Sequence, residues 1–132
     1  MEIRKKTILL LILCVAWSIL IFVLCTMPPN DLPKYRIPYL DKIAHFVFFF
    51  VQSILLSLLF RYRTKRSYPD IIILSTLSAF LYGGVIEVLQ NEFFNRTGEL
   101  YDLVADTLGG LCGAVVYPVV FRLFNRRSKK YK

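Results

Sequence analysis

Four apolar runs limit what this chain can fold into, because each has about the length that a helix needs to cross a membrane. They comprise residues 7–27, 43–60, 71–90 and 103–124. A bilayer core is about 30 Å thick and a helix rises about 1.5 Å per residue, so about 20 residues span it. A mean hydropathy of +0.53 also argues against a water-soluble globule. The sequence therefore predicts an all-α, polytopic membrane protein with four transmembrane helices.

The first run and the short connections point to one membrane domain. Basic residues precede the first run, as in a signal peptide, but the run is long for that role and no small-x-small cleavage site follows it. We therefore expect a retained helix. The connections at 28–42, 61–70 and 91–102 are too short to form another domain. Residues 1–132 are thus expected to form a single domain whose function lies within the bundle.

The basic residues are distributed unevenly between the two sides of the predicted bundle. Of the 17 lysines and arginines, 13 lie before the first run, in the second connection or near the C-terminus, and four lie on the opposite side. The positive-inside rule then places both termini in the cytoplasm. The net charge of +8 reflects this topology. Nucleic-acid binding is not indicated, because the charges form short blocks between apolar runs.

Polar pairs lie near the predicted outer ends of three helices. Asp41 and His45 are four apart, as are Asp102 and Asp106, while Glu87 and Gln90 are three apart. Each spacing places both members on one helix face. Because an ionisable group inside a membrane helix is costly, such residues usually mark a functional site. These pairs therefore predict a polar cluster at one depth.

Lys42 and Arg96 are the basic residues nearest this predicted cluster. Lys42 lies beside Asp41, and Arg96 lies in the connection that precedes the last helix. The segment 95–98 has the composition of a tight turn, which would fold Arg96 back towards the helix ends as a counter-ion. Asp102 also suits the start of a helix, where a carboxylate caps free N–H groups.

The chemistry of the cluster stays open at this stage. It suits a hard divalent cation, acid–base catalysis on a phosphate ester, an amine or sugar headgroup, or hydrogen bonds that only lock the helices. We assign no metal site, and the cofactor is left unknown. Walker, GxGxxG, GxSxG, HExxH and CxxC motifs are absent from the sequence. The three cysteines, Cys14, Cys25 and Cys112, are expected only to pack.

Several other residues are expected to shape the bundle. Gly109 and Gly113 form a GxxxG pattern, which favours close contact between membrane helices. Pro118 is expected to bend the last helix. Many aromatic residues near the outer boundary suggest an interfacial belt, with a groove for an isoprenoid chain as the alternative. They are Tyr35, Tyr39, Phe46, Phe48, Phe49, Phe50, Phe93, Phe94 and Tyr101.

These polar residues and glycines resemble the pattern of the VanZ-like family. The matching pieces are D-K-x-x-H at 41–45, E-x-x-Q at 87–90, Arg96, Asp102 and the glycines of the last run. Asp106 departs from the pattern, since the family usually has asparagine there. The resemblance implies a multi-pass protein of the bacterial plasma membrane and a link to resistance to the glycopeptide teicoplanin.

Three functions follow as hypotheses, and whether the protein is an enzyme is left open. The first is protection of the cell envelope by binding or modifying an outer-leaflet lipid or lipid-linked cell-wall precursor. Its headgroup site would contain Asp41, His45, Glu87 and Arg96, with Lys42 beside them and Gln90, Asp102 and Asp106 orienting them.

The second hypothesis is a membrane-embedded hydrolase or transferase acting on a lipid phosphate. His45 would be its base or nucleophile, Asp41 would orient His45, and Glu87 would act as acid or metal ligand. The third is a structural or regulatory partner of another membrane protein, or a homo-oligomer, which would dock through the GxxxG face.

Overall fold

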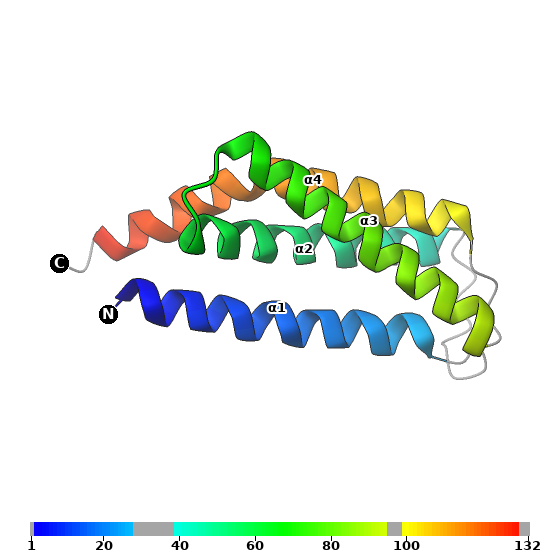
Figure 1. Ribbon diagram of the computed structural model, residues 1–132. Coiled ribbons are helices and arrows are strands. Elements are labelled where there is room, and N and C mark those ends of the chain that lie inside the picture. Colours follow the sequence, from blue (N-terminus) through cyan, green and yellow to red (C-terminus); the bar gives the residue numbers. More distant parts are fainter. Residues whose placement is uncertain (1, 28–38, 95–98, 130–132) are drawn as a thin grey trace.

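The computed structural model describes residues 2–27, 39–94 and 99–129, and in these it contains four long helices (Figure 1). They are α1 (Glu2–Thr26), α2 (Leu40–Arg63), α3 (Tyr68–Phe93) and α4 (Leu100–Lys129). Each is long and apolar enough to cross a membrane. The prediction of an all-α protein with four membrane-spanning helices is confirmed at this level.

The helices extend beyond the apolar runs because their polar flanks are also helical. The start of α3 shows how such an end is stabilised. The Ser67 hydroxyl accepts a hydrogen bond from the backbone N–H of Asp70, and the Asp70 carboxylate accepts one from the backbone N–H of Ser67. This capping box satisfies two N–H groups that the helix leaves without partners. It therefore begins α3 three residues before the run at 71–90.

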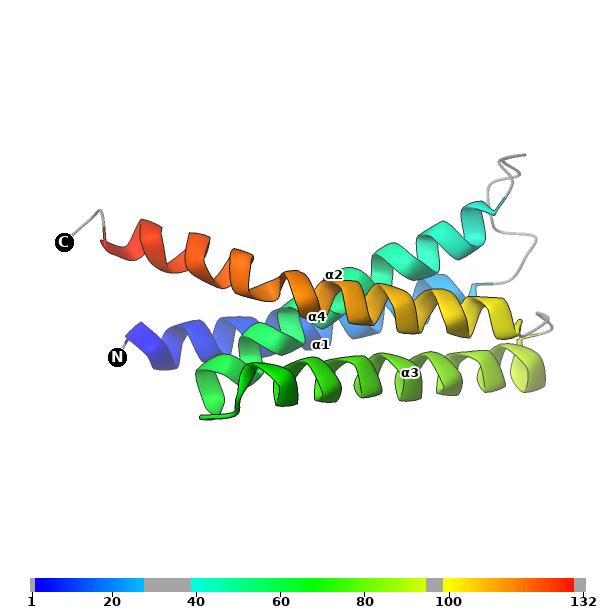
Figure 2. The same ribbon diagram turned by 90° about the horizontal axis from the view of Figure 1, so that it is seen from above.

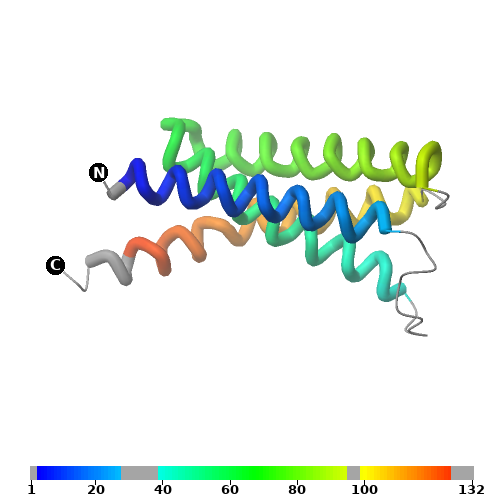
Figure 3. The backbone as a smooth tube through the Cα atoms, turned by 90° about the horizontal axis from the view of Figure 1, so that it is seen from below, coloured from blue at the N-terminus to red at the C-terminus, as the bar shows by residue number. Residues whose placement is uncertain are grey.

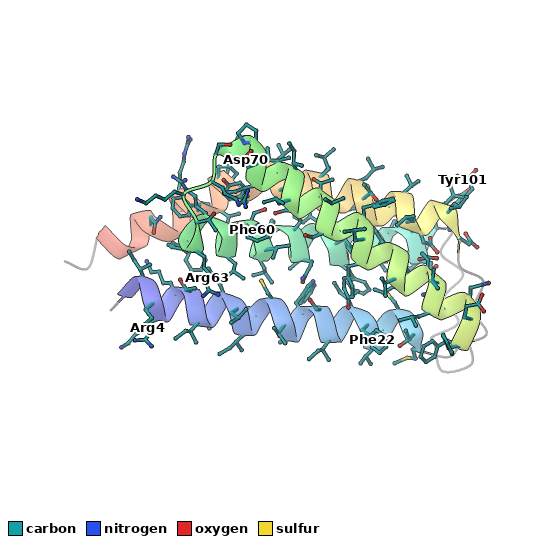
Figure 4. All side chains as sticks on the ribbon, in the orientation of Figure 1. Arg4, Phe22, Phe60, Arg63, Asp70 and Tyr101 are labelled. Carbon is teal, nitrogen blue, oxygen red and sulfur yellow. The ribbon has the colours of Figure 1, made fainter. Side chains whose placement is uncertain are left out.

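The four helices form an elongated bundle with α2 and α3 between α1 and α4 (Figures 1 and 3). The N- and C-terminal ends lie at the same end of the bundle. Arg4 and Arg63 lie towards that end, and Tyr101 lies at the other (Figure 4). We call the end that holds Tyr101 the outer end, following the positive-inside prediction.

Helices α2 and α4 approach closely at the two glycines of the GxxxG pattern. Gly109 lies against the backbone carbonyl of Phe46, and Gly113 lies against that of Phe50, so closely that neither position has room for a Cβ atom. The expected close contact between helices is confirmed, and it occurs within the chain. The glycine face is therefore covered by α2, and it does not provide the docking surface that the third hypothesis required.

The aromatic residues divide between the bundle core and its surface. Phe49 is fully buried and packs against Tyr82, so the interpretation of Phe49 as part of an interfacial belt is wrong. Tyr39, Phe93 and Tyr101 are highly exposed at the outer end, as a belt requires. Tyr35 lies outside the described residues. Phe49 occupies the core because it lies on the same face of α2 as His45, four residues earlier.

Helix α4 also changes direction along its length. Figure 2 shows this change in the orange segment of α4, the part of the chain that includes Pro118. Proline lacks the backbone N–H that an uninterrupted helix would use, and its ring crowds the preceding turn. The predicted bend is therefore present, and it lies on the C-terminal side of the two glycines.

Candidate functional site

Two polar contacts in register join α2 to α4 at the outer end. The Lys42 Nζ atom lies 3.0 Å from Asp102 Oδ1, and the His45 Nδ1 atom lies 2.9 Å from Asp106 Oδ1. The two donors are three residues apart on α2, and the two acceptors are four apart on α4. The His45–Asp106 pair therefore lies about one helical turn below the Lys42–Asp102 pair. The spacing of the motif residues thus places two polar contacts, one above the other, across the interface between α2 and α4.

His45 lies at the junction of three helices. It is 2% exposed, and Asp106 is completely buried. Its second ring nitrogen, Nε2, lies 3.9 Å from the sulfur of Cys25 on α1. The space for Asp106 depends on Gly83 of α3, because a Cβ atom there would collide with the Asp106 carboxylate. The buried pair is therefore held by residues from every helix of the bundle.

Lys42 is shared between two carboxylates. Its Nζ atom lies 2.6 Å from Glu99 Oε2 as well as 3.0 Å from Asp102 Oδ1. The backbone N–H of Glu99 in turn donates a hydrogen bond to Glu87 Oε2 on α3. The Asp102 carboxylate is thus used in an ion pair across the interface, whereas the sequence suggested that it caps its own helix. Glu99 links the start of α4 to both α2 and α3.

Glu87 and Gln90 share a face of α3 but have different partners. The Gln90 amide donates a hydrogen bond of 2.6 Å to the backbone carbonyl of Cys25, which fastens α3 to α1. Glu87 turns towards Glu99, and its second oxygen, Oε1, is buried without a hydrogen-bond partner. Asp106 Oδ2 is buried and unpartnered in the same way. Two carboxylate oxygens of the site therefore have capacity for a ligand.

A shallow pocket of about 280 Å³ opens between α3 and α4 at this end. Its wall combines acidic side chains with apolar residues. The lining residues are Glu87, Val88, Asn91, Glu92, Glu99, Leu100 and Leu103. Glu87 thus belongs both to the pocket and to the polar cluster behind it.

Two sets of side chains bring potential metal ligands together. One contains Asp41, His45 and Asp102, and the other contains His45, Glu87 and Asp106. In each set, one ligand atom per residue lies within 4.8 Å of the others. Asp41 itself is exposed, so the buried set is the one that the bundle encloses.

The structure brings most of the sequence-predicted site residues together. Seven of them lie at the outer end, and Gln90 among these serves to join helices. They are Asp41, Lys42, His45, Glu87, Gln90, Asp102 and Asp106. Arg96, with its predicted turn at 95–98, lies outside the described residues.

Two residues of the site were missed from the sequence. Glu99 was given no role from the sequence, although its position just before an apolar run places it where a helix begins. Cys25 was expected only to pack, yet its sulfur contacts His45 and its backbone carbonyl accepts from Gln90. No local signal identifies Cys25, because both contacts depend on how α1 docks.

A second polar layer deeper in the bundle was also missed. The Gln52 amide donates to the Ser18 hydroxyl at 2.8 Å, and Tyr82 donates to the Ser18 carbonyl at 2.7 Å. Below them, Ser57 and Ser75 are joined by a hydrogen bond of 2.8 Å. The signal was available, since each of these polar residues interrupts an apolar run. This layer fastens α1, α2 and α3 together.

Comparisons with known proteins place this arrangement in a family. No curated protein and no solved structure gives a significant match to the chain. A model of the VanZ/LLP1 family matches residues 7–122, which include every polar pair and both glycines described above. The resemblance seen in the motif residues is confirmed, and the chain belongs to the VanZ/LLP1 family.

Proposed function

We propose that this protein binds an outer-leaflet lipid or lipid-linked cell-wall component through a headgroup that carries an amine or hydroxyl groups. The observation that carries this proposal is the pocket between α3 and α4, in which carboxylates face apolar residues. Binding sites are typically concave and mostly apolar, with a few polar groups that fix orientation. A headgroup attached to a long apolar chain matches both parts of such a wall.

The charges at the outer end favour a cationic or hydroxylated ligand. Glu87, Glu92 and Glu99 line the pocket. Lys42 is the nearest described cation, and it is already bound to Glu99 and Asp102. A carboxylate accepts hydrogen bonds from an ammonium or from sugar hydroxyls, and such charge-assisted bonds are the stronger kind. Arg96, in the adjoining connection, is proposed to contact the phosphate of the same ligand.

Membership of the family gives the proposal its cellular context. The family name carries a general link to teicoplanin resistance. Lipid-linked cell-wall components and lipoglycopeptides are both met at the outer surface of a bacterial plasma membrane. We therefore propose that occupation of this pocket protects the envelope, with the protein located in that membrane and both termini in the cytoplasm.

The test combines direct binding with drug susceptibility. Protein in nanodiscs is titrated with an amine-bearing, lipid-linked cell-wall precursor, and a susceptible host expressing each variant is tested against teicoplanin. Glu87→Gln and Arg96→Ala are expected to weaken binding and remove the protection given by the wild type. Asp70→Asn is the matched control, because it removes a carboxylate at the opposite end of α3. Unchanged binding and protection in both test variants, at equal membrane levels, would refute the proposal.

A hydrolase or transferase acting on a lipid phosphate is the second candidate. It is favoured by the 2.9 Å contact between His45 and Asp106, since an oriented histidine is a common general base. The role that the sequence assigned to Asp41 would then pass to Asp106. Against this candidate, phosphoryl chemistry needs positive charge on the transferred group, and Lys42 is already engaged. Turnover of a lipid phosphate by purified protein, lost in His45→Ala, would establish it over simple binding.

A further inference from the structure

We infer that His45, Glu87 and Asp106 form a binding site for one divalent transition-metal ion of the Zn²⁺ or Mn²⁺ type. The three residues come from α2, α3 and α4, and one ligand atom from each lies within 4.8 Å of the others. An imidazole combined with two carboxylates is a donor set suited to these ions. The helices thus deliver three ligands to one point near the outer end.

The spacing of the ligand atoms allows a metal ion after a modest rearrangement. Ligands of a tetrahedral zinc ion lie about 2.1 Å from it, so neighbouring ligand atoms are about 3.4 Å apart. His45 Nδ1 and Asp106 Oδ1, at 2.9 Å, need to part by about half an ångström. The remaining separations, which are within 4.8 Å, need to close by at most about 1.4 Å.

The unpartnered carboxylate oxygens are an independent sign of a ligand. Asp106 Oδ2 and Glu87 Oε1 are both buried without a hydrogen-bond partner, and the Asp106 side chain is wholly inaccessible to solvent. Leaving a buried carboxylate oxygen unsatisfied is costly, and buried charges are normally paired or bound to a metal. A cation between these residues would satisfy both oxygens at once.

The balance of charge at the outer end also favours a bound cation. Lys42 is the one basic residue among the described residues of the outer end, and its ammonium is shared by Glu99 and Asp102. A protonated His45 would offset only one of the two buried carboxylates, Glu87 and Asp106. A divalent ion offsets both and leaves the imidazole neutral, the form in which it binds metals.

The surroundings of His45 are compatible with this role. Its Nε2 atom lies 3.9 Å from the Cys25 sulfur. When the ring carries its proton on Nε2, that proton points at the sulfur and the Nδ1 lone pair faces Asp106. Two acceptor atoms at 2.9 Å then need a proton or a cation between them. Cys25 would act as the outer partner that fixes the ring, in the place that a carboxylate, carbonyl or water usually takes at metal-bound histidines.

The biological role of the ion rests on the proposed function, because Glu87 belongs to both the metal site and the headgroup pocket. Binding of the ion can nevertheless be measured without any lipid ligand. Untagged protein in detergent is stripped with a chelator and titrated with Mn²⁺, followed by electron paramagnetic resonance, and with Zn²⁺ in competition. The chain contains one histidine, so a nitrogen coupling to bound Mn²⁺ identifies His45 without a mutation.

We expect one Mn²⁺ ion per chain with an imidazole coupling, and competition by Zn²⁺. Asp106→Asn and Glu87→Gln should each weaken binding at least about 100-fold, since even residues behind the ligands affect affinity 10- to 100-fold. Asp70→Asn is the matched control and should bind as the wild type does, because Asp70 lies at the opposite end of α3 and outside the ligand set. Wild-type metal affinity in this control would show that general negative charge does not account for the binding.

Either of two results would overturn the metal site. One is wild-type protein that binds no stoichiometric Mn²⁺ or Zn²⁺, in which case a shared proton joins His45 and Asp106. The other is binding without a nitrogen coupling that survives Asp106→Asn and Glu87→Gln. Precursor binding by chelator-treated wild type separates the two proposals: if it persists while no metal binds, the headgroup site stands and the metal site fails.

Discussion

Replacing Gly109 by alanine should separate α2 from α4, and Gly84→Ala provides a matched control. A Cβ atom on Gly109 would lie closer to the Phe46 carbonyl than real atoms approach, and that obstacle is backbone, which cannot rotate away. At Gly84 the nearest atom to such a Cβ is a Leu103 methyl carbon at 4.0 Å, an ordinary contact. Both positions are helical, so alanine improves helix propensity equally, by about 0.5–1 kcal/mol. The difference between the variants therefore isolates the helix contact.

The magnitude follows from how far the helices must move. An ordinary carbon–oxygen contact is about 3.3–3.6 Å, so α2 and α4 must part by about 1 Å at Gly109. A gap of that size forfeits about a quarter to a half of each van der Waals contact nearby. Overpacking of this kind typically costs about 1–3 kcal/mol, and we expect Gly109→Ala to be less stable than Gly84→Ala by that amount.

The assay is reversible unfolding in mixed micelles, followed by far-ultraviolet circular dichroism and by fluorescence. Trp17 is the single tryptophan, and its indole donates to the Phe48 carbonyl, so its emission reports the α1–α2 contact. Circular dichroism reports all four helices. Equal unfolding free energies for the two alanine variants would refute the argument that the glycine contact sets the distance between α2 and α4.

Three further substitutions test other contacts, each by unfolding free energy. Lys42→Met should lower the free energy of unfolding by about 1–3 kcal/mol. This is less than the loss of a fully buried ion pair would cost, because Lys42 is partly exposed. Adding Asp102→Leu should recover part of the lost stability, because it removes the carboxylate left without its partner. Ser57→Ala should cost about 0.6 kcal/mol by removing its bond to Ser75, and a cost above 2 kcal/mol would indicate a larger role. Ser67→Ala should cost about 1 kcal/mol and speed amide exchange in the first turn of α3, with later turns unchanged.

The apolar runs predicted the four helices because the membrane imposes their length and composition. The polar pairs were also predicted, since residues three or four apart share a helix face wherever the helix packs. The ends of the helices were not predicted, because the apolar runs were defined by hydropathy, whereas the helices continue through their polar flanks. Ser67 caps α3 outside the apolar run for this reason.

The partners of the polar residues could not be predicted, because a helix face does not reveal which neighbour it meets. The sequence paired His45 with Asp41 on its own helix, whereas the structure gives His45 a direct contact with Asp106 on α4. Glu87 and Gln90 share a face but contact different helices. Such contacts depend on the docking of the helices, and one sequence contains no direct record of that docking.

The glycines and the polar residues of the motif act as one structural unit. Gly109 lies three residues after Asp106 on α4, and its contact with the Phe46 carbonyl adjoins His45 on α2. The same close approach that excludes a Cβ atom at Gly109 therefore brings His45 within 2.9 Å of Asp106. Gly83 supplies the space for that carboxylate from the side of α3. A variant that widens the glycine contact should accordingly weaken any ligand held by His45 and Asp106, although it removes no polar group. Loss of Mn²⁺ affinity in Gly109→Ala, with affinity retained in Gly84→Ala, would show that this spacing is part of the site itself.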